Sequence, residues 1–211
     1  GEGFSFMKDA QDPMNTHGTI VRINTDGSIP ADNPFADGEA GAPAVWSYGH
    51  RNVQGLYYDA ATGTLYETEH GPKGGDELNL VTPGTNYGWP EITYGVNYDG
   101  TIITNKTEAE GMAQPLTYWV PSIAPSGLVM LTSDVYPGWK GDLFTGGMNG
   151  PAGLELTRID MENGEVVGKQ SLFDGEYPIR DVVQGPDGHL YVATKDFDGI
   201  FRVDIAEAEA E

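Results

Sequence analysis

The chain has 211 residues, 38% of them hydrophobic, and a formal net charge of −21 from 11 basic and 32 acidic residues. This length suffices for one domain with a sizeable core, and the charge argues against nucleic-acid and membrane partners because it would repel phosphates and anionic lipids. The sequence contains no cysteine, which excludes disulfides, thiolate catalysis and thiolate metal sites. The acidity is equally typical of proteins from salty environments, although its carboxylates also suit calcium.

Thirty glycines and 14 prolines interrupt the chain too often for many helices of ordinary length. Between them lie short runs of β-branched and aromatic residues, which predict strands. Glycine or asparagine stands where strands should reverse, as at Thr25–Gly27, Asp59–Gly63, Glu162–Gly164 and Pro186–Gly188. The predicted strands are Gly18–Asn24, Gln54–Tyr58, Thr64–Thr68, Glu77–Val81, Gly127–Leu131, Leu143–Gly147, Leu154–Ile159, Arg180–Gln184, Leu190–Thr194 and Ile200–Asp204.

Segments without a strand pattern interrupt this series. Pro30–Pro43 and Gly95–Pro115 are predicted loops, with a short helix expected within Asn105–Ala113, and Ala206–Glu211 is expected to be a frayed, solvated tail. The hairpin that begins at Gln54 has a counterpart that begins at Val182, and repeats of roughly 40 to 50 residues built on such hairpins favour a propeller over a sandwich. We therefore expect one all-β propeller domain over residues 1–211.

Two segments carry residues suited to ligand binding. Arg51 and Asn52 stand just before a predicted strand, and a forked cation beside an amide can grip a planar ligand that bears carboxylates. The alternative is an arginine that pairs with a neighbouring acid and braces a blade. Further on, Gly71 and Pro72 lie in a glycine-rich turn before the carboxylates of Asp76 and Glu77, a composition that suits a calcium shell of six to eight oxygens but equally an ordinary solvated β-turn.

Together with Gly84–Pro90, these segments resemble the glucose/sorbosone dehydrogenase family, the soluble aldose sugar dehydrogenases that depend on pyrroloquinoline quinone (PQQ). The resemblance extends to Gly18–Phe35, Pro121–Gly127 and Ile179–Gly188, in the same order as in the family. It implies that the chain is the C-terminal part of such an enzyme. The implied fold is about three to four of the four-stranded antiparallel blades of a six-bladed β-propeller.

The resemblance also implies roles for individual residues. Arg51, Asn52 and Arg180 correspond to residues that contact PQQ, and Asn149 stands where the family commonly has a lysine in the same pocket. Gly71 and Pro72 would offer carbonyls to the Ca²⁺ that contacts PQQ. Glu77 and Tyr87 would belong to a second, structural calcium site. The implied substrate is an aldose sugar, and the implied location is periplasmic or secreted.

The sequence departs from the family pattern at several places. The segment that should hold the family's catalytic histidine is absent from these 211 residues, and His50 or His70 is expected to be a structural histidine rather than a replacement base. Two positions each lack a cation that the family has in this pocket. Asn149 stands in place of a common lysine, and Pro178 stands in place of a frequent arginine. An incomplete ring would expose the flank of a blade, to be covered by another chain, by a second copy in a homodimer, or by the rest of a longer protein.

Two alternative functions fit parts of this pattern. One is a calcium-binding propeller module, for assembly or binding, without catalytic activity. The other is a propeller hydrolase of the lactonase type, for which Glu69, Asn86 and Asp181 are conceivable metal ligands.

Overall fold

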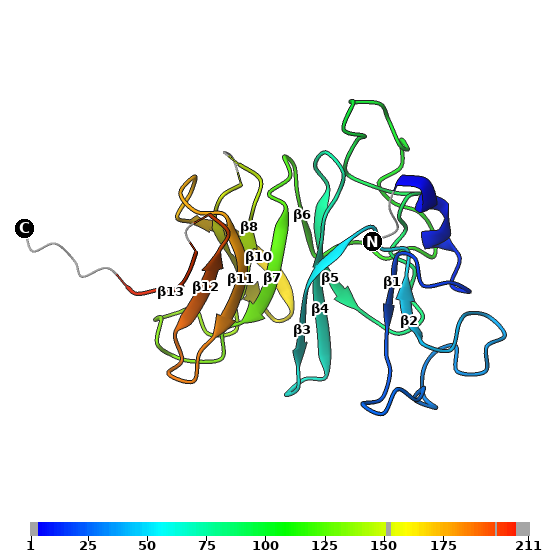
Figure 1. The fold of residues 1–211 in the computed structure, drawn as a ribbon, viewed down its shortest axis with the longest axis horizontal. Coiled ribbons are helices and arrows are strands. Elements are labelled where there is room, and N and C mark those ends of the chain that lie inside the picture. The colour runs from blue at the N-terminus through cyan, green and yellow to red at the C-terminus, as the bar shows by residue number, and fades with distance from the viewer. Residues whose placement is uncertain (1–3, 151–152, 197, 206–211) are drawn as a thin grey trace, which may run out of the picture. The chain divides into compact units, whose positions relative to one another are not determined.

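The computed structural model describes residues 4–150, 153–196 and 198–205, and their regular secondary structure consists almost entirely of antiparallel strands (Figure 1). The described residues include one short 3-10 helix, η1 (Phe4–Gln11). The chain divides into two compact units, one formed by residues 1–54 with 58–122 and the other by residues 55–57 with 123–211.

The first unit contains a two-stranded sheet and a four-stranded sheet. In the small sheet, β1 (Thr19–Val21) pairs with β2 (Val45–Tyr48). In the larger sheet each strand lies beside the next one in the chain, in the order β3-β4-β5-β6, which is the meander expected of a propeller blade. Its strands are β3 (Val53–Asp59), β4 (Thr64–Glu69), β5 (Asp76–Val81) and β6 (Thr117–Trp119).

The second unit contains a second four-stranded meander and a three-stranded one, in the orders β10-β9-β8-β7 and β11-β12-β13. Two of the four sheets therefore have the four antiparallel strands expected of a blade. The strands are β7 (Pro125–Met130), β8 (Leu143–Gly147), β9 (Leu156–Glu162), β10 (Glu165–Leu172), β11 (Ile179–Gln184), β12 (Leu190–Thr194) and β13 (Gly199–Arg202).

Each predicted strand overlaps an observed one, and β8 and β12 have the predicted bounds. The sequence did not predict β2, β6 or β10. The edge strand β10 contains only exposed and half-buried residues, three of them exposed in succession, so its pattern is too polar to resemble a buried strand. The short helix expected within Asn105–Ala113 is wrong, because this segment is a loop in which Met112 bridges Asn86. The tail at 206–211 lies outside the described residues.

No helix in the described part of the chain is long and apolar enough to cross a membrane.

The core of the second unit forms around Tyr136, which is almost completely buried. The Tyr136 hydroxyl donates to the carbonyl of Val203 at 2.6 Å and accepts from the backbone nitrogen of Leu190 at 2.9 Å. One side chain from the β7–β8 connection thus satisfies backbone groups at the start of β12 and just after the end of β13. Around it pack apolar residues from several strands, among them Leu131, Phe144, Leu156, Ile179 and Val192.

In the first unit, a close backbone contact places residues 49–52. Gly49 has a φ of +79°, and a Cβ there would lie 2.2 Å from Oδ1 of Asn86 and 2.6 Å from the nitrogen of Gly88. The Trp89 nitrogen also donates to the Gly49 carbonyl at 2.8 Å. Only glycine fits this position, so the segment after β2 lies directly against residues 86–89.

We expect Tyr136→Phe to lower the free energy of unfolding by about 2–4 kcal/mol, because it leaves a buried N–H and a buried carbonyl without their partner. Tyr191→Phe is the matched control, since the Tyr191 hydroxyl donates to Asp187 at the exposed surface. Its cost should stay within about 0.5 kcal/mol. Urea unfolding of both variants measures the difference, and equal midpoints would contradict the role given to Tyr136.

We expect Gly49→Ala to destabilise the protein by about 3 kcal/mol or more, because backbone strain and a steric clash add together. Gly27→Ala is the control, with a φ of +83° but nothing within 4 Å of the added Cβ. It should cost only about 1–2 kcal/mol, the strain of the left-handed conformation alone. Thermal and urea unfolding compare the two, and a similar loss in both would show that the contact with residues 86–88 is unimportant.

Candidate functional site

A group of polar side chains is buried on one face of the β4–β5 pair. Glu67 and Glu69 are two positions apart on β4, so both side chains point to the same face of the sheet. Their partners on β5 are Asn79 and Glu77, respectively. Glu67 and Asn79 are completely buried, and Glu69 is 4% exposed. The Asn79 amide nitrogen donates to Oε1 of Glu67 at 2.8 Å and to Oε2 of Glu77 at 3.2 Å. Asparagine thus links two carboxylates that would otherwise repel each other.

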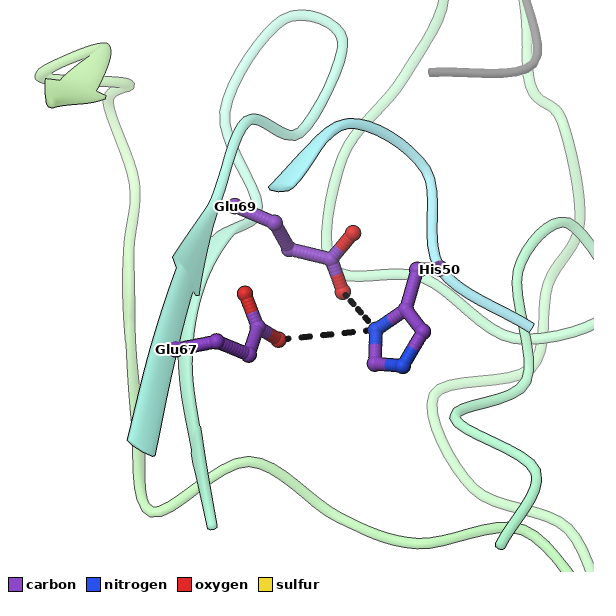
Figure 2. A group of neighbouring side chains, drawn as sticks. All are labelled: His50, Glu67 and Glu69. Atoms are coloured by element: carbon purple, nitrogen blue, oxygen red, sulfur yellow. Dashed lines mark ion pairs between the residues drawn. The ribbon is translucent and has the colours of Figure 1, made fainter. Parts of the chain in front are cut away.

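His50 completes this group from the loop that follows β2 (Figure 2). Its Nδ1 lies 3.5 Å from Oε1 of Glu67 and 3.5 Å from Oε1 of Glu69, and the side chain is 1% exposed. On its other edge, Nε2 lies 2.9 Å from the Ser47 hydroxyl. The ring stacks on Tyr87 with centroids 4.5 Å apart.

Burial and mutual repulsion dominate the electrostatics of this cluster. Burial raises the pKa of Glu67 to about 7, and the charge of Glu69 adds to this effect. Burial, followed by the charge of Glu69, also raises the pKa of Glu77 well above its ordinary value. Burial opposes the charged form of His50, but Glu67 and Glu69 together outweigh it and raise the pKa of His50 to about 9. The two glutamates therefore stabilise a positive charge on His50.

The second oxygen of Glu69 holds Arg51 and Asn52 in place. Oε2 of Glu69 accepts from the backbone nitrogens of Arg51 at 2.6 Å and Asn52 at 3.2 Å. The guanidinium of Arg51 lies over the Trp89 ring, 5.4 Å from its centroid, and its Nη1 donates to the carbonyls of His70 and Gly71, both at 2.9 Å. The predicted quinone-binding pair is thus fixed by its backbone and, for Arg51, by its side chain.

The glycine-rich turn between β4 and β5 folds back closely on itself. A Cβ at Gly71 would lie 2.2 Å from the Gly74 oxygen and 2.3 Å from the Gly75 carbonyl carbon, so the backbone of residues 74 and 75 packs directly against residue 71. The Gly71 nitrogen donates to Oδ1 of the buried Asp76, at 2.9 Å, which closes the turn. Gly71 and Pro72 are both buried. The backbone carbonyls of such a turn are the kind of ligand that calcium takes.

Glu77 and Tyr87, the other predicted metal ligands, line one small polar cavity together with Arg51, Glu69 and Gly71. The Tyr87 hydroxyl donates to the Leu80 carbonyl at 2.6 Å and accepts from the Thr82 nitrogen at 3.0 Å. Because the hydroxyl is engaged in these bonds, a metal at Tyr87 would use its backbone carbonyl.

Arg180 and Asn149 belong to the second unit. Arg180, on β11, is exposed, and its Nη1 lies 3.7 Å from the sulfur of Met148. Asn149, the next residue after Met148, forms an isolated bridge with Gly153, and its nitrogen donates to the Ile123 carbonyl. The second unit therefore brings these two predicted residues near each other, at the end of β8.

Sequence reasoning missed the buried cluster of His50, Glu67 and Asn79. The signal available was two glutamates two positions apart in a strand, which must share a face. The expectation that His50 is structural rather than a base exposed to substrate agrees with its burial and with its contact to Ser47.

Known proteins are similar to this chain in sequence and in fold. The family model of glucose/sorbosone dehydrogenase matches residues 1–203. Aldose sugar dehydrogenase YliI of Escherichia coli is 41% identical over 212 aligned positions, which cover 94% of this chain and 56% of that protein. The chain spans about half the length of the first curated relatives it matches, 48% and 56%.

Solved structures agree with this assignment. A crystal structure of a glucose dehydrogenase matches 98% of this chain and 60% of its own, at 40% identity and a TM-score of 0.90. The PQQ-bound form of aldose sugar dehydrogenase from Streptomyces coelicolor matches 96% of this chain and 53% of its own, at 32% identity and a TM-score of 0.69. The expected partial β-propeller is thereby confirmed, and the chain belongs to the glucose/sorbosone dehydrogenase family.

Proposed function

We propose that this chain is the C-terminal part of a PQQ- and calcium-dependent aldose sugar dehydrogenase, and that it forms one wall of the quinone site. The observation that carries the proposal is the placement of Arg51, whose guanidinium lies over Trp89 and against the carbonyls of His70 and Gly71. A fixed cation beside a carbonyl-rich turn suits a planar, anionic quinone bound next to a metal ion.

The residues present fit such a ligand. PQQ carries three carboxylates, and a chain with a net charge of −21 can bind it only where local cations offset repulsion. The Nε of Arg51 is buried and has no hydrogen-bond partner within the described residues, so the guanidinium retains a donor. Asn52 adds an amide beside it, whereas PQQ contacts by Arg180 and Asn149 stay predictions from the family resemblance.

Calcium would be held by the carbonyls of Gly71 and Pro72. A carbonyl has two lone pairs, so Gly71 can accept from Arg51 and still offer one to an ion. Glu77 and the backbone of Tyr87 would hold a second, structural calcium. When bound, PQQ supplies the electron acceptor for oxidation of the sugar hydroxyl, and the calcium beside it supplies Lewis acidity.

The chain's own residues would orient these groups. Glu69 fixes the backbone at residues 51 and 52, Trp89 limits the movement of the Arg51 guanidinium, and Asp76 fixes the turn at Gly71. Because these residues are already held in place before the cofactor binds, less conformational entropy is lost on binding. The aldose substrate and a periplasmic or secreted location belong to the same proposal.

An exposed sheet edge supports the expectation that another segment or a second copy covers one flank. On the edge strand β13, Ile200 is 74% exposed and Phe201 is 47% exposed. Apolar residues on an unpaired edge favour pairing with further protein.

Arg51→Gln should weaken PQQ binding about 10- to 100-fold in the presence of calcium, because it removes a charge-assisted contact worth about 1.5–3 kcal/mol. Arg22→Gln is the matched control, since Arg22 also lies over a tryptophan, Trp46, and pairs with Asp32. Quinone absorbance measures binding, and dye reduction with several aldoses measures turnover. Absence of PQQ binding to the unaltered protein at saturating cofactor would contradict the enzyme proposal, and calcium binding without PQQ would favour the non-catalytic calcium module.

Gly71→Ala should weaken calcium binding at least tenfold, because the added methyl group would clash with the backbone of residues 74 and 75 and shift the turn that carries the Gly71 and Pro72 carbonyls. Gly168→Ala is the control, since its Cβ would make only ordinary contacts with Asp160, at 3.7 Å or more. Calorimetric titration with calcium measures both variants. Unchanged affinity in Gly71→Ala would place the calcium elsewhere.

A further inference from the structure

His50, Glu67 and Glu69 bring one nitrogen and two carboxylate oxygens together at a buried point, and the proposed PQQ and calcium ligands do not include these three side chains. Figure 2 shows both glutamates extending from β4 toward the same edge of the imidazole ring. The three ligand atoms lie within 4.8 Å of one another.

The distances favour a shared metal ion over direct hydrogen bonds. Charge-assisted N–H···O bonds measure about 2.7–2.9 Å, whereas His50 Nδ1 lies 3.5 Å from each carboxylate oxygen. In a tetrahedral site with bonds of about 2.0–2.1 Å, ligand atoms lie about 3.3–3.4 Å apart. The two nitrogen–oxygen separations thus match neighbouring ligands around one ion.

The surroundings already orient each ligand atom. Nε2 of His50 can donate to the Ser47 hydroxyl at 2.9 Å, which leaves the lone pair of Nδ1 facing the glutamates. Asn79 donates to the Oε1 atom of Glu67, and the backbone of residues 51 and 52 donates to the other oxygen of Glu69. A second layer of hydrogen bonds of this kind is usual around metal ligands.

Two buried atoms lack the partners that burial normally requires. Within the described residues, neither Nδ1 of His50 nor Oε2 of Glu67 has a hydrogen-bond partner, and both side chains are 99% buried or more. Such atoms cost free energy unless an ion or water satisfies them. A cation held between the imidazole and the two carboxylates would satisfy them.

We propose that His50, Glu67 and Glu69 bind a divalent first-row transition metal, of which Zn²⁺ is the redox-inert example. An imidazole nitrogen with two carboxylates suits this class, whereas calcium prefers a shell of oxygens only. The ion would tie the loop after β2 to β4, and through Glu69 it would steady the backbone of Arg51. The proposal is independent of whether the protein binds PQQ.

The experiment begins with the full chain, dialysed against a chelator and then transferred to millimolar calcium, which fills oxygen-only sites. Co²⁺ is added as a spectroscopic probe, and the visible absorbance and the metal retained after gel filtration are measured. We expect one retained Co²⁺ per chain and its displacement by Zn²⁺, which binds such a site more tightly. Failure to retain Co²⁺ in the presence of calcium would overturn the proposal.

Variants identify the ligands. His50→Gln should weaken Co²⁺ binding at least 100-fold, while Ser47→Ala, which removes only the outer hydrogen bond, should weaken it about 10- to 100-fold. His17→Gln is the matched control, because His17 forms a partly exposed pair with Asp9 that could hold metal adventitiously. Equal binding by His50→Gln, or a loss confined to His17→Gln, would overturn the assignment.

A measurement on the unaltered protein keeps the proposal falsifiable if His50→Gln does not fold. X-ray absorption of the Co²⁺-loaded chain should show the scattering of one imidazole ligand. A spectrum with oxygen ligands alone would place the metal elsewhere and would overturn the proposal.

Discussion

The structure around the candidate site depends on the burial of carboxylates on one face of the β4–β5 pair. Ionised carboxylates that are removed from water must be hydrogen-bonded or balanced by positive charge. Here the balance comes from His50, from the amide of Asn79 and from the backbone nitrogens of residues 51 and 52. Because His50 and these backbone nitrogens come from the loop that follows β2, satisfying the carboxylates also fixes the position of that loop.

This arrangement gives Glu69 two tasks, one for each oxygen. One oxygen faces His50, and the other holds the backbone of Arg51, whose guanidinium reaches the carbonyls of the glycine-rich turn. A change in the charge of the buried cluster would therefore act on the residues that are proposed to bind PQQ, through a single side chain. The coupling is short and follows direct contacts, so it needs no conformational change.

Glycines permit the close approach on which the same region depends. At Gly49 and Gly71 atoms of neighbouring residues occupy the space that a Cβ would need, so the chain can pack this closely only because both residues are glycine. The contrast with Gly27, where an added methyl group would meet nothing, shows that glycine serves local turn geometry in one place and tertiary packing in the other. The strongly acidic surface makes such fixed local cations as Arg51 necessary for any anionic ligand.

The sequence by itself determined the features that depend on neighbouring residues. Turn glycines and apolar runs predicted β8 and β12 with the bounds that the structure shows. The motifs from Gly49 to Pro90 identified the family. Tertiary structure decided the rest: β10 is a strand because it pairs with β9, and the segment 105–113 is a loop. It also decided that Glu67 faces Asn79 and His50. A polar side chain becomes buried or exposed according to partners that register and packing bring from elsewhere in the chain, and local sequence does not encode those contacts.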